Sequence, residues 1–328
     1  MNKIIKFSIG LLLSVVGLFY AFRQFNWAEF IELLRGVNYW FLFAAVAIQL
    51  ATVWIRALRW KWLLAPIDNV SIKLLFDATM IGYFGNNVLP LRMGELLRAY
   101  VVSNNTKIST SKVIGTLIVD RMLDFLALIF FAIFFLFFSD LIDIPKSIMI
   151  FSIILILILF IIIIMVGSKN PNWENIKNRY KIFQSKFGSK IFDIVANIIS
   201  GLSVLNKTPH KIGVYSFIAL LWIMYYISFI LILKGVNLEL SIMNAGVLYV
   251  LLVVSISIPA APGYIGTYHA TCVAVLTNIY NISLNTSQTF AVLSHAVIFI
   301  PFVLIGAIFF LKNSLNFSKL KSLDKVEA

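Results

Sequence analysis

The sequence predicts an all-α protein, a polytopic bundle of helices integral to a membrane. Of its 328 residues, 61% are hydrophobic and only 12% are charged, and the mean hydropathy is +0.95. That composition leaves too little charge to cover a water-exposed surface. Several apolar runs approach or exceed the roughly 20 residues that cross a bilayer as a helix. The alternating strands of a transmembrane barrel are not seen in the sequence, so a barrel is not expected.

Six full spans are expected, together with two apolar regions that are interrupted. The spans cover residues 4–22, 39–60, 113–138, 147–166, 212–233 and 287–311. The first interrupted region, 71–103, is broken at Asn86, Asn87 and Pro90. The second, 241–280, is broken at PAAPGYIG, residues 259–266. Because proline and glycine disrupt the helical hydrogen-bond ladder, each region is expected to form a broken or re-entrant helical hairpin. Two kinked full spans are the alternative.

The basic residues predict the orientation. If the N-terminus is cytoplasmic and each hairpin returns to its own side, the cytoplasmic segments hold 22 Lys and Arg and the outer loops hold 4. This split follows the positive-inside rule, so both termini are expected on the cytoplasmic side of the inner (plasma) membrane. The hairpins then enter from opposite sides, as in inverted-repeat transporters that bind substrate near the membrane midplane.

A single transmembrane domain, 1–328, is expected. Its first half, 1–167, and its second half, 212–328, are joined by a basic amphipathic connector, 168–211, on the cytoplasmic surface. The net charge of +13 indicates anionic lipid rather than nucleic acid as the partner. The single cysteine, Cys272, excludes an intrachain disulfide and a cysteine metal cluster. Because the sequence carries no catalytic or phosphate-loop motif, neither an enzyme nor a cofactor or metal is expected.

The first break, GNNVLPLRMGELLRAY (85–100), places charged residues beside a helix breaker. Arg92, Glu95 and Arg98 are spaced three residues apart, so neighbours share a helical face and can pair. A helix starting near Pro90 would direct partial positive charge toward an anion, and the two asparagines of the break add polar groups. The segment therefore predicts a phosphate-sized polar site. A surface helix with solvated charges is the alternative.

A second group of charges, VDRMLD (119–124), lies inside an expected span. Arg121 is about 8 residues in, or roughly 12 Å below the start of the span. Such charges cost about 2.5–3.5 kcal/mol each, so Asp120, Arg121 and Asp124 are expected to face protein, water or a ligand. Two aspartates against one arginine leave a negative charge, which protonation or the other arginines (Arg92, Arg98) would balance. The alternative is a structural ion network that holds the first hairpin.

The second break, IPAAPGYIGTYHA, contains two glycines, Gly263 and Gly266, that permit sharp turns and close approach. A helix that begins after Gly266 would place His269 in its first turn, where it could bind phosphate or carry a proton. A kinked helix with an interfacial histidine is the alternative. His295, in the last span, is expected to form an interhelical hydrogen bond.

Tryptophans and arginines gather near the expected cytoplasmic end of the span 39–60. Trp54, Trp60 and Trp62 fit an aromatic belt, and with Arg56 and Arg59 they predict either simple anchoring or a patch that contacts lipid headgroups.

Four of these segments together resemble the lysylphosphatidylglycerol synthase transmembrane-region family, also called the flippase-like domain family. They are RALRWKWLL (56–64), GNNVLPLRMGELLRAY (85–100), VDRMLD (119–124) and PAAPGYIGTYHA (259–270). The family includes the flippase half of the bacterial multiple peptide resistance factor. The resemblance implies about eight membrane segments that move lipid headgroups between leaflets.

The chain departs from the family pattern at two positions. Members often carry Glu-Arg at Asp120-Arg121, and many carry Glu at His269. The soluble aminoacyl-transferase domain of the resistance factor has no counterpart in the sequence, so the resemblance does not imply lipid aminoacylation.

These observations predict a lipid flippase in which a phospholipid or lipid-linked headgroup crosses through a polar cavity between the hairpins. Arg121, with Arg92 or Arg98, would bind the phosphate, and the neighbouring acids would balance those charges or bind an amine. Those acids are Asp120, Asp124 and Glu95. The alternative is a non-transporting membrane partner that regulates a lipid synthase or glycosyltransferase through the connector. An intramembrane enzyme is the third reading.

Overall fold

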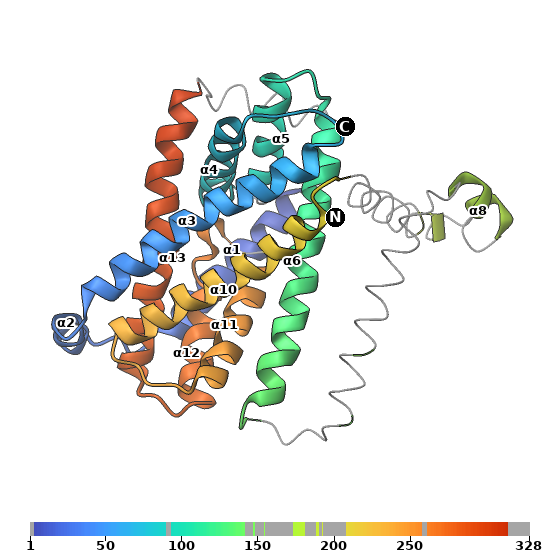
Figure 1. Cartoon of the computed structure of the whole chain (residues 1–328). Coiled ribbons are helices and arrows are strands. Elements are labelled where there is room, and N and C mark those ends of the chain that lie inside the picture. The colour runs from blue at the N-terminus through green and yellow to red at the C-terminus, as the bar shows by residue number, and fades with distance from the viewer. Residues whose placement is uncertain are drawn as a thin grey trace.

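The computed structural model describes residues 3–89, 93–141, 147, 154, 173–180, 188–189, 192, 208–257 and 261–313. Over these residues the chain is helical and contains no strand (Figure 1). Four helices of this described part are long and apolar enough to cross a membrane. They are α3 (Tyr39–Leu64), α6 (Thr110–Phe138), α10 (Lys211–Gly235) and α13 (Leu284–Lys312). The expected class, a helical membrane protein, is confirmed at this level.

The helix boundaries follow several of the expected spans. The four long helices correspond to the spans expected over 39–60, 113–138, 212–233 and 287–311. Helix α1 (Lys3–Phe22) matches the first span to within one residue. The span expected over 147–166 lies almost entirely outside the described residues, and so does most of the connector, of which α8 (Trp173–Arg179) is described.

Polar caps set the starts of several helices. Helix α2 (Trp27–Arg35), nine residues long, was not expected from the sequence. It begins at Asn26, whose side chain accepts from the backbone N–H of Ala28 at 3.0 Å. Helix α3 begins at Asn38 in the same way, and α13 begins at Ser283. Each cap satisfies a backbone donor that has no partner within its own helix.

Two long helices form the centre of the bundle. Helices α3 and α10 pack side by side and cross the view of Figure 1 diagonally, with α6 and α13 on either side of them. A polar contact joins the pair: the Ser228 hydroxyl donates to the carbonyl of Ala45 at 3.1 Å and accepts from the Gln49 amide at 3.2 Å. Such interhelical hydrogen bonds help to fix helix pairs within a membrane.

The first broken region forms a tight pair of short helices, α4 (Ile72–Val88) and α5 (Gly94–Asn104). A β-carbon added at Gly94 would lie 2.0 Å from the carbonyl oxygen of Gly82, so the close approach of the two helices requires glycine. The Asn86 side chain accepts from the Gly94 N–H at 2.9 Å. Helix α5 therefore starts at Gly94, four residues later than the start expected near Pro90.

The second broken region has the predicted interruption. Helix α11 (Ile242–Ser257) ends before it, a short 3-10 turn η3 (Pro262–Tyr264) follows, and α12 (Thr267–Asn278) begins directly after Gly266. Gly263 and Gly266 have φ values of 71° and 98°. Figure 1 shows α4 and α5 at one end of the bundle and α11 and α12 at the other, and η3 packs against α4. The turn of the second break therefore packs against the first helix of the first broken region.

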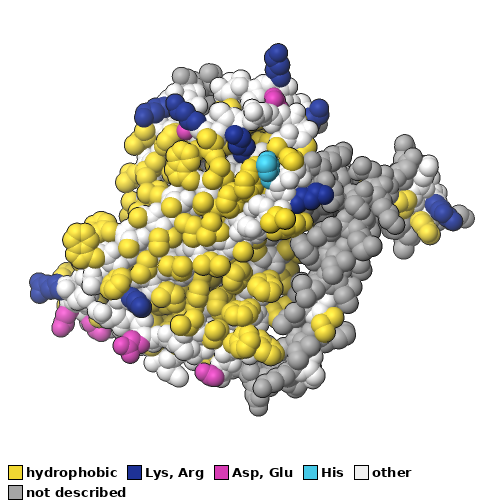
Figure 2. Space-filling view, in the orientation of Figure 1, with side chains coloured by type: hydrophobic (Ala, Val, Ile, Leu, Met, Phe, Trp, Pro, Cys, Tyr) yellow, Lys and Arg dark blue, Asp and Glu magenta, His cyan; other side chains and the backbone are white. Residues whose placement is uncertain are grey.

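Much of the outer surface is apolar. Figure 2 shows hydrophobic side chains across the middle of the visible face, with charged side chains gathered toward its two ends. Large apolar side chains such as Trp40, Phe125 and Leu304 are exposed, at 82%, 61% and 62%. An apolar band of this extent is expected where helices face lipid rather than water.

Candidate functional site

A compact set of ion pairs joins α3 to α6 within the bundle. The Arg59 guanidinium lies 2.6 Å from Asp120 and 2.8 Å from Asp124. Arg56 lies 2.7 Å from Asp124 and 3.3 Å from Asp120. The side chains of Arg59 and Asp120 are fully buried. Each aspartate therefore contacts both arginines, which compensates for the cost of burying the four charges.

Helix α5 adds a second layer to these ion pairs. Arg98 Nη1 lies 3.0 Å from Glu95 Oε2 and 3.8 Å from Asp120 Oδ2. The guanidinium of Arg98 also lies 4.3 Å from the ring centroid of Trp60, a cation–π arrangement. The Trp60 indole N–H donates to the Thr116 hydroxyl at 3.0 Å, which fixes the ring against α6. The first broken hairpin is thereby attached to α3 through Trp60 and to α6 through Asp120.

Arg121 lies at the edge of this set of charges. Its Nε is 3.1 Å from Glu95 Oε1, and its terminal nitrogens are 3.6 Å from Asp120 and 3.5 Å from Asp124. The side chain of Arg121 is 43% exposed, whereas those of the arginines on α3 and α5 are at most 6% exposed. Arg121 is therefore the arginine of the set that a ligand can reach most directly.

We call these seven side chains the ion network. Its members in the described part of the chain are Arg56, Arg59, Glu95, Arg98, Asp120, Arg121 and Asp124. Helix α10 joins it through the Tyr225 hydroxyl, which accepts from Arg56 Nη2 at 3.0 Å. With every group ionised, four arginines face three carboxylates, so the formal excess is one positive charge. The sequence predicted that a further arginine would balance the two aspartates, and Arg98 lies 3.8 Å from Asp120; Arg56 and Arg59 also contact both aspartates.

Two arginines of the ion network lie where the sequence did not predict them. Arg56, Arg59 and Trp60 were expected in an interfacial patch, but all three are buried. Trp54 remains exposed and Trp62 stacks on Phe217, so only part of that patch faces outward. The spacing of these residues could have predicted the ion pairs. Arg56 and Arg59 are three residues apart in one apolar span, and Asp120 and Asp124 are four residues apart in another, so each pair presents its charges on one face of its helix.

Several arginines of the ion network have buried nitrogens with no hydrogen-bond partner among the described residues, and Arg98 is one of them. Nε and Nη2 of Arg98 are buried and have no hydrogen-bond partner among the described residues. Buried polar groups are nearly always hydrogen-bonded, so such donors point to a ligand or water that would complete them. An anion is the chemical match, because guanidinium N–H groups only donate.

An open groove lies between α5 and α6 beside the ion network. Its volume is about 570 Å³, within the range of about 300–1,000 Å³ that is usual for small-molecule sites. Its wall is apolar apart from Glu95 and Arg121. The lining residues are Glu95, Leu96, Ile114, Leu117, Ile118, Arg121, Met122, Phe125 and Leu126. An apolar ligand with one anionic group would fit these surroundings.

The structure brings together five of the residues expected at the site. Asp120, Arg121, Asp124, Glu95 and Arg98 belong to the ion network. Two further residues of the first hairpin were also expected at the site. Asn87 is buried in the last turn of α4, and Arg92 lies outside the described residues.

Gly263, Gly266 and His269 form a second polar centre. The rings of His269 and His295 are 4.7 Å apart between centroids, and Phe22 of α1 covers His269 at 5.6 Å. His295 Nε2 lies 2.7 Å from the carbonyl oxygen of Gly263, the interhelical hydrogen bond expected for this residue. His269 is in the first turn of α12, as expected, and its Nδ1 has no hydrogen-bond partner among the described residues.

Comparison with known proteins gives a consistent family. The sequence model described as the lysylphosphatidylglycerol synthase TM region matches residues 7–306. A UPF0104 membrane protein of Methanocaldococcus jannaschii is 28% identical over 235 residues, 69% of this chain and 93% of that protein. One of Methanothermobacter thermautotrophicus is 23% identical over 280 residues, 80% of this chain and 82% of that protein.

Other relatives match over a shorter stretch. A second UPF0104 membrane protein of Methanocaldococcus jannaschii is 27% identical over 135 residues, which is 40% of each chain. No solved structure matches the chain.

Proposed function

We propose, since this chain belongs to the lysylphosphatidylglycerol synthase TM region family, that it is a lipid flippase. It would move a phospholipid or another lipid-linked phosphate headgroup between the two leaflets. In this role the chain would need no catalytic residue, metal or cofactor. Membrane lipids are its proposed partners.

The positive excess of the ion network is the observation that carries this proposal. Ionisable groups at membrane depth are costly and are usually found where ions or substrates pass. Here four arginines face three carboxylates, and Arg121 is partly exposed at an apolar groove. A lipid phosphate diester carries one negative charge, so its binding would balance the excess.

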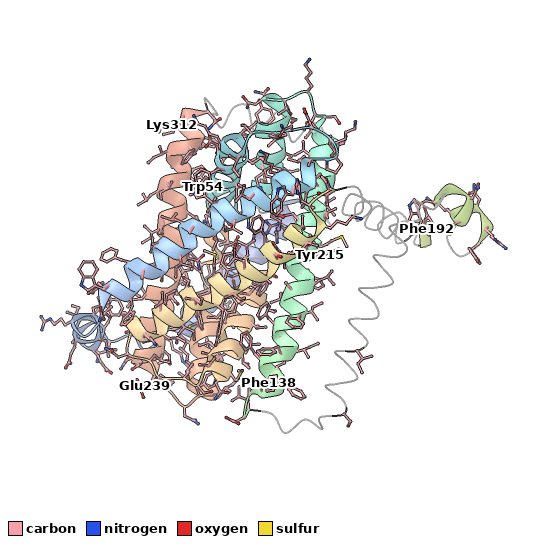
Figure 3. The ribbon with its side chains drawn as sticks, in the orientation of Figure 1. Trp54, Phe138, Phe192, Tyr215, Glu239 and Lys312 are labelled. Carbon is pink, nitrogen blue, oxygen red and sulfur yellow. The ribbon has the colours of Figure 1, made fainter. Side chains whose placement is uncertain are left out.

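The arrangement of the helices supports a more detailed topology. We propose six full spans and two re-entrant hairpins related as an inverted repeat, with both termini on the cytoplasmic side of the inner membrane. The opposite placement of α4–α5 and α11–α12 in Figure 1 supports this. In Figure 3, Lys312 lies near the end that holds α4 and α5, and Glu239 lies at the other end, consistent with a basic cytoplasmic side.

Substitution of Arg121 tests the proposal. We expect the wild-type protein in liposomes to move at least one anionic phospholipid in a leaflet-accessibility assay over a lipid panel. Arg121→Ala should slow that movement by about tenfold or more, because a charge-assisted contact to phosphate is lost. Arg121→Lys should retain part of the rate.

A matched control separates the site from the general effect of removing charge. Arg35 is an exposed arginine at the end of α2, and Arg35→Ala should leave the rate unchanged. Equal rates for wild type and a folded Arg121→Ala variant would remove Arg121 from the mechanism.

A non-transporting role is the second candidate, and the family description favours it because it names a synthase. In that case the chain would bind or regulate a lipid synthase or a glycosyltransferase in the membrane. Wild-type protein that moves no lipid in the panel, but copurifies stoichiometrically with such an enzyme, would support this candidate over the flippase.

A further inference from the structure

We propose that the groove between α5 and α6 binds one phosphate-bearing lipid, with its phosphate on Arg121 and a hydrocarbon chain along α6. The inference rests on the proposed function for the class of its ligand. It adds the place where the lipid binds, the contact that its phosphate replaces and a protein surface for its chain.

The groove has the shape and chemistry for a hydrocarbon chain. Ile114, Ile118, Met122 and Phe125 are spaced three or four residues apart along α6, so they form one continuous stripe. The lining from Ile114 to Leu126 spans 13 residues, a rise of roughly 18 Å along the helix. That length covers more than half of a hydrocarbon core of about 30 Å.

The contacts of Glu95 show how a phosphate could be accepted. Glu95 uses Oε1 for Arg121, at 3.1 Å, and Oε2 for Arg98, at 3.0 Å. A phosphate oxygen can replace Oε1 on Arg121 while Glu95 stays paired with Arg98. No buried carboxylate is then left without a partner, which would otherwise be strongly unfavourable.

The charge of the site selects the headgroup. Binding one phosphate diester cancels the single positive excess of the ion network, whereas an uncharged lipid leaves it in place. Arg121 is the most exposed of the four arginines, at 43%, so the phosphate can reach it from the groove. The wall around it offers apolar atoms for the chain and no second arginine. The geometry therefore fits an anionic headgroup attached to a long apolar chain.

Photolabelling of the purified full-length protein tests this placement. The probe is a phosphatidylglycerol with a diazirine in one acyl chain, added to protein in detergent, and labelled peptides are mapped by mass spectrometry. We expect labelling to concentrate on the α6 segment that contains Met122 and Phe125. Excess unlabelled phosphatidylglycerol should compete, and a diacylglycerol with the same chains should not.

Two pairs of variants separate the headgroup contact from the chain contact. Arg121→Gln should lower labelling of α6 by about tenfold, as expected for the loss of a charge-assisted hydrogen bond, and Arg121→Lys should restore part of it. Ile118→Trp fills the groove and should lower labelling by a similar factor. Phe130→Trp is its control, because Phe130 is an exposed residue of the same helix and does not line the groove.

The outcomes distinguish this inference from the proposed function. Groove labelling that depends on Arg121 and Ile118 supports the inference even if the wild-type protein moves no lipid. Labelling spread evenly over outward-facing residues such as Leu304 of α13 would overturn it, even if lipid movement is observed. Labelling that is unchanged in folded Arg121→Gln and Ile118→Trp variants would overturn it as well.

Discussion

Asp120→Ala is expected to lower the free energy of unfolding by about 3–5 kcal/mol, the range seen when one partner of a buried ion pair is removed. Asp120 lies within 4 Å of all four arginines of the ion network, and its closest contact is 2.6 Å from Arg59. Its loss would raise the formal excess from one positive charge to two. The unfolding midpoint of the purified protein in detergent, followed by tryptophan fluorescence, measures the effect.

Two further variants show whether the loss comes from unpaired arginines. Asp68→Ala removes an exposed aspartate and should change the stability by no more than about 0.5 kcal/mol. The double variant Asp120→Ala/Arg59→Ala should be more stable than the sum of the two single effects predicts, because the two side chains are in direct contact. A folded Asp120→Ala protein with the wild-type midpoint would contradict this account of the ion network.

The sequence was sufficient to predict five of the seven residues of the ion network. Three ionisable groups within six residues of an apolar span have no favourable place in lipid, so Asp120, Arg121 and Asp124 had to face something polar. The partners on α3 were not predictable in the same way. Arg56 and Arg59 are 64 and 61 residues away from Asp120 in the chain, and only the packing of α3 on α6 brings them together.

The fold shows the same division between local and tertiary causes. Proline and glycine act locally, so both breaks were predicted from the sequence. Helix α12 begins directly after Gly266, as expected. The start of α5 depends instead on a side chain from another helix, because Asn86 of α4 binds the Gly94 N–H. Helix α2 is nine residues long, too short for a hydrophobic period to reveal it.

The crossing of α1 and α12 is a second tertiary feature, and it explains the need for glycine at the second break. A β-carbon at Gly17 would lie 2.8 Å from the carbonyl oxygen of Gly266, and one at Gly266 would lie 2.2 Å from that of Ser14. The Ser14 hydroxyl also accepts from the N–H of Ala261 at 2.8 Å. The first helix therefore holds the turn that precedes α12 and, with it, the position of His269.

Gly266→Ala is accordingly expected to destabilise the protein by about 2–5 kcal/mol. The φ value of 98° is unfavourable for any residue with a β-carbon, at a cost of about 1–2 kcal/mol. Overpacking against a neighbour typically costs a further 1–3 kcal/mol or so. Here the neighbour is the backbone of Ser14, which cannot move aside by a side-chain rotation. Thermal unfolding in detergent measures the sum of these two effects.

Gly115→Ala is the matched control, because it adds the same methyl group to a membrane helix. A β-carbon at Gly115 of α6 would meet no atom within 4 Å, and the backbone there is helical. Its stability should equal that of the wild type or exceed it by about 0.5–1 kcal/mol, since alanine favours the helix. If Gly266→Ala were as stable as Gly115→Ala, α1 would not constrain the second break, and His269 would be free to adopt another position.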